Sequence, residues 1–282
     1  MEAALNLRSR MVESGRIDVD ELKLLQYNDN CNVNNNDDSD MDLDPSLAME
    51  RLYERRGKMF GVLVCKVPNS DSDSVILKAY AGKLGGQWNL PGWAPIIGRV
   101  PESLPVFNRI SAEVTEIFGM IDDINFSTQG GAADADADHH AGEGVGNERG
   151  QSQSQPQTQT IDERVKQLIK ERARLANLAL EEVRCHQLVT NFRGETSPIT
   201  AIYSRGPTKL PGGVGDCAAP KLLAEAARLG LQPTGIAEIF IGATGGMSTT
   251  KGDGQFYDAC EQRCEQIAGF MLCGLDVVVE ES

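Results

Sequence analysis

Three cysteines in the second half of the chain are placed where they could bind one metal ion. Cys217 follows a glycine-rich turn over residues 212–215 and stands at the start of a predicted helix. Cys260 and Cys264 are four residues apart, so a helix would carry both thiols on one face. Thiolates are preferred zinc ligands, and three of them with a water molecule form an open tetrahedral site. The spacing therefore predicts a Zn²⁺ site.

The same cysteines have a second interpretation. Cysteine is also a small buried apolar residue, and a spacing of four residues is that of a helical core stripe. A C-x-x-x-C spacing is in addition a weaker zinc signal than C-x-x-C. On the sequence alone, zinc ligands and core cysteines both remain open.

A glycine-rich segment over residues 82–95 holds both tryptophans of the chain, Trp88 and Trp93. Tryptophans on such a loop can stack on nucleic-acid bases, or they can cover the open end of an apolar core. We favour the core interpretation and keep Trp88, Trp93 and Lys221 as candidate binding residues.

Apolar patterning predicts an α/β fold that positions these residues. Strands at 59–67 and 75–80 flank a polar turn and predict a hairpin, whose nearly continuous apolar first strand indicates a sheet covered on both faces. The later elements alternate between helix and strand, which is typical of a layered sheet. They are a strand at 198–203, a helix at 217–229 ended by Gly230, a strand at 233–242, a helix at 257–272 and a strand at 275–279.

The domain organisation follows from changes in composition. Residues 1–44 are predicted to be a mostly disordered extension, because an Asn/Asp tract cannot bury enough apolar area to order itself. A short helix is expected within 1–27, with Val19, Leu22 and either Leu24 or Leu25 on one side. Residues 45–282 form a single domain with a helical insertion at 103–190. In that insertion, amphipathic helices at 103–118 and 161–189 flank a disordered low-complexity tract at 127–160.

Composition excludes several classes of protein. The formal net charge of -14 argues against broad, non-specific binding to nucleic acid, although a local basic groove stays open because much of the acidity lies in the polar tracts. Seven unevenly spaced cysteines do not resemble a secreted disulfide framework. No apolar run approaches the ~20 residues of a membrane span. We expect an intracellular protein without a membrane segment, cytoplasmic by default, with the nucleus or an organelle as open alternatives.

The order of elements around the cysteines resembles the zinc-dependent cytidine-deaminase fold. Four segments are more specifically similar to the N-terminal region that precedes the catalytic domain of some bacterial RluA-type RNA pseudouridine synthases, namely residues 57–64, 79–84, 215–223 and 254–265. The resemblance implies a three-layer α/β fold, in which a mixed sheet has flanking helices and an inserted helical pair. It also implies zinc on Cys217, Cys260 and Cys264, and RNA or an RNA-modifying enzyme as the partner.

The resemblance does not imply activity. The synthase domain, with its Arg-Leu-Asp type motif, is not present in this sequence. Zinc deaminases place a glutamate two residues after the first ligand, and that position is Ala219 here. Because loss of a proton shuttle costs ~10²–10⁴-fold in rate, we expect a non-catalytic, zinc-stabilised domain that acts in RNA binding or RNA modification. The alternatives are an active nucleoside or nucleic-acid base deaminase that uses Asp216, Glu238 or Glu265 instead, and a metal-free interaction module.

Overall fold

A computed structural model describes residues 1–18, 44–54, 56–70, 73–130, 155–203, 210–244, 250–261 and 263–275. The chain divides into two compact units. The first combines Met1–Val100 with Arg184–Ser282, and the second is Pro101–Val183. Every candidate site residue named from the sequence lies in the first unit. Among the described helices, none combines the length and the apolar character needed to cross a membrane.

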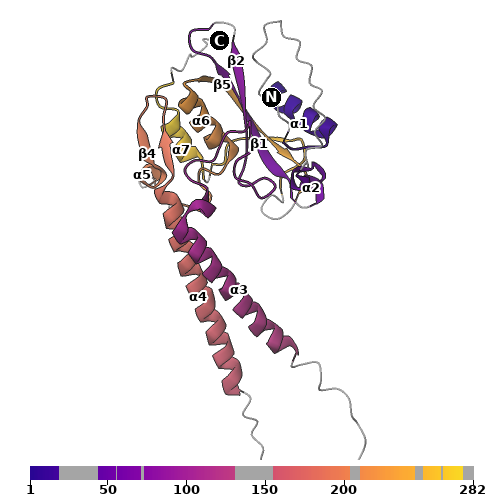
Figure 1. The fold of residues 1–282 in the computed structure, drawn as a ribbon, viewed down its shortest axis with the longest axis vertical. Helices are drawn as coiled ribbons and strands as arrows, with labels where there is room; N and C mark the ends of the chain where they lie inside the picture. Colours follow the sequence, from indigo (N-terminus) through magenta and orange to yellow (C-terminus); the bar gives the residue numbers. More distant parts are fainter. Residues whose placement is uncertain are drawn as a thin grey trace, which may run out of the picture. The chain divides into compact units, whose positions relative to one another are not determined.

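The first unit is built on an antiparallel sheet, whose described strands have the order β2-β1-β5-β6 (Figure 1). The predicted hairpin is confirmed as β1 (Lys58–Lys66) and β2 (Ser74–Tyr80), and β5 (Gln232–Ile241) lies on the other side of β1. The short strand β6 (Phe256–Tyr257) pairs with β5. The chain is therefore a mixed α/β protein. The parallel pairing of the expected mixed sheet is not found among the described strands, and residues 276–279 of the predicted last strand lie outside them.

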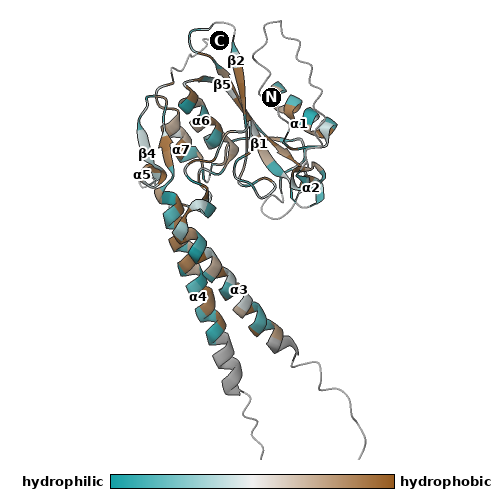
Figure 2. Ribbon diagram, in the orientation of Figure 1, coloured by the Kyte–Doolittle hydropathy of each residue, from teal (hydrophilic) through white to brown (hydrophobic). Residues whose placement is uncertain are grey.

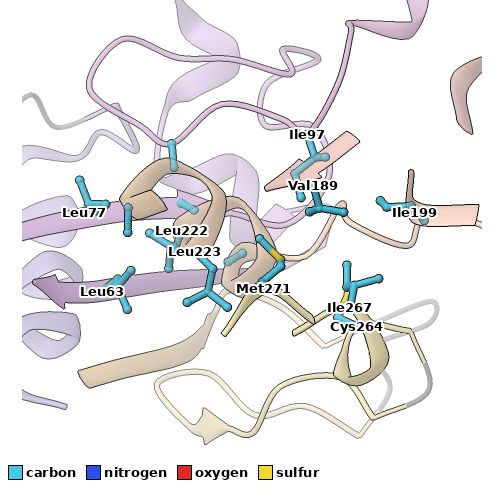
Figure 3. Close-up of a cluster of buried hydrophobic side chains, with 14 of the residues drawn as sticks. Leu63, Leu77, Ile97, Val189, Ile199, Leu222, Leu223, Cys264, Ile267 and Met271 are labelled. Atoms are coloured by element: carbon cyan, nitrogen blue, oxygen red, sulfur yellow. The ribbon is translucent and has the colours of Figure 1, made fainter. Parts of the chain in front are cut away.

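One face of the sheet is covered by α6 (Ala218–Leu229), packed with α5 (Ile199–Tyr203) and α7 (Glu265–Met271). Leu63 of β1 points to this side, and Leu222 and Leu223 of α6 pack in the same apolar cluster (Figure 3). Ile267 and Met271 attach α7 to that cluster. Because α6 and α7 share one core, their first residues are held close together. The predicted end of α6 is confirmed at Gly230, whose φ of 65° is the left-handed conformation that glycine adopts readily.

The opposite face is covered by the N-terminal helix α1 (Glu2–Ser14), the 3₁₀ turn Pro45–Leu47 and the short helix α2 (Glu50–Glu54). Met11 of α1 is 0% exposed and packs with Phe60 and Val62 of β1. The helix expected within 1–27 thus lies earlier than the apolar pattern placed it, and Val19, Leu22, Leu24 and Leu25 lie outside the described residues. The first residues of the chain are consequently part of the core.

An aspartate joins α1 to the far end of the sheet. Asp253 accepts hydrogen bonds from Arg8 Nη2 at 2.8 Å, from the Tyr53 hydroxyl at 3.2 Å and from the Gly242 amide at 2.9 Å. Its partners lie on α1, on α2 and just after β5. One carboxylate therefore holds three separate segments around the loop that precedes β6.

The second unit contains the helices α3 (Pro105–Gly130) and α4, the latter running over Gln155–Cys185 and ending just beyond the unit. A 3₁₀ turn, Pro101–Ser103, precedes α3. Ile110, Ile117 and Ile121 of α3 pack against Leu175 and Ala179 of α4, and the two helices run antiparallel. Apolar bands recur along both helices between polar stretches (Figure 2). Both helices extend into the tract predicted to be disordered at 127–160, of which residues 131–154 lie outside the described ranges.

Two predicted elements are wrong. The strand expected at 198–203 is instead β4 (Thr196–Pro198), paired with β3 (Leu188–Thr190) and followed directly by α5. The helix expected at 257–272 begins only at Glu265, because Phe256 and Tyr257 pair with β5 and a turn follows them. Apolar periodicity alone did not separate these short elements from their neighbours.

Candidate functional site

The glycine-rich turn places Cys217 at the first turn of α6. Gly213 and Gly215 have φ angles of 74° and 87°, a left-handed conformation that favours glycine. Cys217 then adopts an extended conformation as the N-cap residue, with φ -68° and ψ 161°. The carbonyl of Asp216 accepts a hydrogen bond from the Gly82 amide at 2.8 Å, which attaches the turn to the loop after β2. The predicted helix start at Cys217 is therefore confirmed.

Cys264 comes to the same place from the start of α7. Its side chain is 1% exposed, and Figure 3 shows it beside Ile267. The Cys217 thiol donates a hydrogen bond to the Cys264 sulfur, which also accepts from the backbone amides of Gly215 and Cys217. These donors lower the pKa of Cys264, whereas the contact with Cys264, together with burial, raises the pKa of Cys217. The two pKa values are therefore shifted in opposite directions.

Cys260 is near this pair but is not on the helix that its spacing suggested. It lies in the turn before α7, where its carbonyl oxygen accepts the amide of Cys264 at 2.9 Å. Charge on Cys260 raises the pKa of Cys264 and contributes to the raised pKa of Tyr203, whose hydroxyl donates to the Arg263 carbonyl at 2.7 Å. Cys260 is therefore the third thiol of the neighbourhood, although the shared helix face predicted for it is wrong.

The donor set fits zinc in part. Cys217 and Cys264 are near enough for the thiol of Cys217 to act on the pKa of Cys264, and a tetrahedral zinc ion binds thiolates at about 2.3 Å. Across the described ranges, no three His, Cys, Asp or Glu side chains stand close enough together to hold a metal ion. A zinc site with the three predicted cysteines would therefore require Cys260 to turn toward Cys217 and Cys264.

Glu238 of β5 delivers a buried carboxylate to the first turn of α6. Its Oε1 accepts the backbone amide of Ala219 at 3.1 Å. Burial raises the pKa of Glu238, although that amide and the charge of Lys251 act in the opposite direction. The contact needs a glycine on the neighbouring strand, because a Cβ on Gly61 would lie 2.9 Å from the Ala218 Cβ and 3.6 Å from the Glu238 Cγ.

The other two candidate carboxylates lie on either side of the thiols. Asp216 is next to Cys217, and burial raises its pKa while the charges of Lys221 and Arg263 lower it. Glu265 is exposed in the first turn of α7, with its backbone amide directed to the Cys260 carbonyl at 3.3 Å. Of the three carboxylates, Glu238 is hydrogen-bonded to the first turn of α6.

The candidate binding residues divide into core and surface. Trp93 is 6% exposed and packs edge-on against Tyr80, with the ring centres 5.4 Å apart. Lys221 is 1% exposed, and its Nζ donates to the carbonyls of Tyr80 at 2.9 Å and Gly82 at 3.1 Å. Trp88 is half-buried, with the Lys83 ammonium 5.1 Å from its ring centre. Trp93 and Lys221 thus hold the fold, and Trp88 remains at the surface.

Sequence reasoning missed two residues beside Glu238. Tyr257 of β6 lies opposite Glu238 in the sheet, and the Lys251 ammonium stands 3.7 Å from its ring centre. The Tyr257 hydroxyl accepts the Gly252 amide at 2.7 Å. A short edge strand carries little pattern of its own, so only the strand pairing brings these groups to the site.

Comparison with known proteins gives no match, since no family model, no curated protein and no solved structure is similar enough to this chain to assign it.

Proposed function

We propose that this protein is a zinc-stabilised, deaminase-like domain without catalytic activity, acting in RNA binding or RNA modification. The observation that carries the metal assignment is the contact between the Cys217 and Cys264 sulfurs at the starts of α6 and α7. Cys260 is the third ligand, one turn before Cys264, and reaches the pair by a local adjustment of its turn.

The surrounding backbone supports a thiolate site. The amides of Gly215 and Cys217 donate to the Cys264 sulfur, and the charge of Arg263 acts to lower the pKa of Cys217, so both favour negative charge at the thiols. The apolar cluster under α6 and α7 keeps the two cysteines in place. Zinc bound across them would link two elements far apart in sequence, so its binding energy would contribute directly to folding.

Metal analysis tests this proposal. We expect one zinc per chain in protein purified without chelators, and a large loss of zinc together with a lower unfolding temperature in Cys217→Ser and Cys264→Ser. Cys273→Ser is the matched control, because this half-buried thiol only donates to the Gly269 carbonyl of α7. Zinc-free wild-type protein whose stability does not respond to added zinc would refute the metal assignment.

The RNA assignment rests on the resemblance and on one surface feature. Trp88 and Lys83 combine an aromatic ring with a positive charge on a loop, a pair that suits stacking on a single-stranded base. Trp88→Ala should weaken binding to single-stranded RNA by about tenfold, since one stacked base contributes ~1–3 kcal/mol. Lys66→Ala, an exposed lysine at the end of β1, is the control. If Trp88→Ala weakens binding no more than Lys66→Ala does, or if RNA does not bind, the RNA assignment fails.

A second candidate function, deamination of a nucleoside or nucleic-acid base, is favoured by Glu238. Its carboxylate contacts the amide of Ala219, the position at which zinc deaminases carry their glutamate. A zinc ion in such enzymes supplies an activated water. Burial raises the pKa of Glu238, which suits a group that accepts and returns a proton.

Ammonia release from cytidine, adenosine and RNA decides between the two functions. Activity that is lost in both Glu238→Gln and Cys217→Ser, while Glu265→Gln retains it, would establish deamination and reject the non-catalytic proposal. The zinc content of Glu238→Gln should equal that of the wild type, because Glu238 is not among the proposed ligands. No ammonia from zinc-loaded protein would leave the non-catalytic function as proposed.

A further inference from the structure

The two helices of the second unit share an outer side that carries apolar side chains. The guanidinium carbon of Arg172 on α4 lies 4.6 Å from the ring centre of Phe118 on α3. Phe118 is nevertheless 47% exposed, so the two residues meet at an outer side of the pair and not in its core. Ile169 is three residues before Arg172, on the same side of α4, and is 43% exposed. Each helix therefore exposes a large apolar residue on this side.

This side continues along both helices at the spacing of a packed helix face. Steps of three or four residues keep to one side of a helix. The residues that such steps connect to Phe118 and to Arg172 follow the same order of steps, 4-3-4-4-3, in both helices, and none of them is buried. We call them the outer stripe, and they are Phe107, Ser111, Val114, Phe118, Asp122 and Asn125 of α3, with Val165, Ile169, Arg172, Ala176, Leu180 and Val183 of α4.

The opposite side of the pair is charged. Arg174 is two residues from Arg172, about 200° around the helix. Its Nε donates a hydrogen bond to Glu171 at 2.8 Å, which raises the pKa of Arg174, and the charge of Glu113 on α3 adds to that shift. The outer stripe, in contrast, has only two charged members, Asp122 and Arg172. Low charge on one side of a helix pair whose other side is charged is typical of a surface that packs against a partner.

The two charges of the outer stripe fit a second copy of this chain. A two-fold axis parallel to the helices places α3 of one copy on α4 of the other, so that Asp122 of each copy approaches the partner's Arg172. Arg172 is level with Phe118, and Asp122 is one turn further along, a gap of about 6 Å that an arginine side chain spans. A two-fold axis across the helices would instead stack α3 on α3, a helix with four acidic residues and one basic residue over 105–126.

The size of this side is that of a stable interface. The 26 residues of α3 make it about 39 Å long, and two helices side by side are about 20 Å wide. The outer side of the pair thus offers about 800 Å², the area that each partner buries in a standard interface. Two pairs related by the parallel axis also have antiparallel neighbours throughout, which is the common arrangement of a four-helix bundle.

We propose that this protein is a dimer in which the outer stripes of two copies pack face to face into a four-helix bundle, with α3 of each copy on α4 of the other. The dimer concerns the second unit alone, so it is independent of the zinc and RNA assignments. Its failure would leave those assignments unchanged.

Sedimentation equilibrium of the full chain at several concentrations tests the dimer. The wild type should have twice the mass of one chain. Ile169→Glu should weaken the dimer by about 100-fold or more, because the two-fold symmetry places the change in the buried interface twice, and Phe118→Gln should also weaken it. Leu178→Glu and Met120→Gln are the matched controls. They are similarly exposed, at 41% and 46%, but each is two residues from a member of the outer stripe and so lies on the other side. Circular dichroism checks that every variant keeps its helix content.

Charge reversal tests which helices face each other. Asp122→Arg and Arg172→Asp should each weaken the dimer by about tenfold, since each creates two like-charged pairs, and the double variant should restore it. A dimer that Asp122→Arg strengthens would overturn the arrangement, because α3 would then face α3.

Two results would overturn the dimer surface itself. One is a wild-type mass of a single chain at every concentration up to about 100 μM, which is far above the Kd expected for a standard interface; another molecule would then cover the outer stripe. The other is a dimer that Ile169→Glu weakens no more than Leu178→Glu does, because its interface would lie elsewhere.

Discussion

Replacing Lys221 should make the stability of this protein depend on pH in a defined way. Its ammonium group is buried beside the carbonyls of Tyr80 and Gly82, and burial lowers its pKa to about 8. Lysine in an unfolded chain has a pKa of about 10.4. Between these two values the unfolded chain binds a proton that the folded chain has released. Burial of the charged lysine therefore destabilises the wild type. This destabilisation is fully present below about pH 8 and decreases as the pH rises.

The magnitude follows from the two pKa values. Between about pH 7 and about pH 9.5, linkage adds about 2 kcal/mol to the free energy of unfolding of the wild type. Lys221→Met removes the titrating group and keeps much of its volume. Near pH 7 it loses two hydrogen bonds of ~1.5–3 kcal/mol each and escapes a burial cost of about 3 kcal/mol, so the net loss is small. Near pH 9.5 the wild type no longer bears that cost, and the deficit of the variant grows by about 2 kcal/mol.

Urea unfolding of both proteins at the two pH values measures the difference directly. Lys66→Met, which removes an exposed lysine at the end of β1, reports the background effect of losing one positive charge. A deficit of Lys221→Met that stays constant or shrinks at the higher pH would refute the reasoning. It would indicate that Lys221 is hydrated in solution, as a ligand-binding lysine would be.

Three further changes test the packing around the site. Met11→Ala should lower the free energy of unfolding in urea by about 2–5 kcal/mol, because Met11 is 0% exposed, whereas Val12→Ala at 51% exposure should change it little. Gly242→Ala should cost about 3 kcal/mol or more by the same assay, since its φ is 108° and a Cβ would meet backbone at 2.4 Å; Gly230→Ala, with open space around it, should cost about 1 kcal/mol. Asp253→Asn should cost about 1–2 kcal/mol near neutral pH. Burial raises the pKa of Asp253, but the hydrogen bonds from Gly242 and Arg8 outweigh it, so the pKa in the folded protein is lowered. The stabilisation by Asp253 is therefore fully present above about pH 4, the pKa of aspartate in an unfolded chain, and is lost as the pH falls through the lower pKa of the folded protein.

The long, strongly patterned elements could be predicted from the sequence. The hairpin at 59–67 and 75–80 and the helix ended by Gly230 are present because apolar runs, a polar turn and a C-terminal glycine act locally. The prediction of a helix at 257–272 was wrong, because Tyr257 pairs with Glu238 of β5. A pairing between residues so far apart in sequence leaves no trace in local apolar periodicity. The packing of α1 was also missed, because its few apolar side chains gain their burial from strands far along the chain.

The sequence pointed directly to the thiols of the candidate site, whereas it gave Glu238 only as one of three alternative carboxylates. Cys217 and Cys264 were found because glycines and helix starts leave local signals. Their contact nevertheless depends on the packing of α6 against α7. Cys260 was assigned to a helix face that does not form, since the turn before Glu265 replaces the first turns of that helix. The sequence made Lys221 a candidate binding residue. Its structural role is apparent only from the hydrogen bonds that its ammonium group donates to the carbonyls of Tyr80 and Gly82.

The absence of a glutamate at position 219 is weaker evidence against catalysis than the spacing suggests. A proton-transfer group has to satisfy a position in space, within ~3 Å of the proton that it moves, and any element that reaches that position satisfies it. Here β5 runs beside β1, and Gly61 leaves room for the Glu238 side chain to reach the Ala219 amide. The Glu238 carboxylate therefore lies next to Ala219, which occupies the position of the glutamate in zinc deaminases. Whether the domain is an enzyme thus depends on whether Glu238 exchanges protons with a substrate or only caps the first turn of α6. Glu238→Gln separates these roles, because the amide oxygen keeps the cap and cannot act as the base.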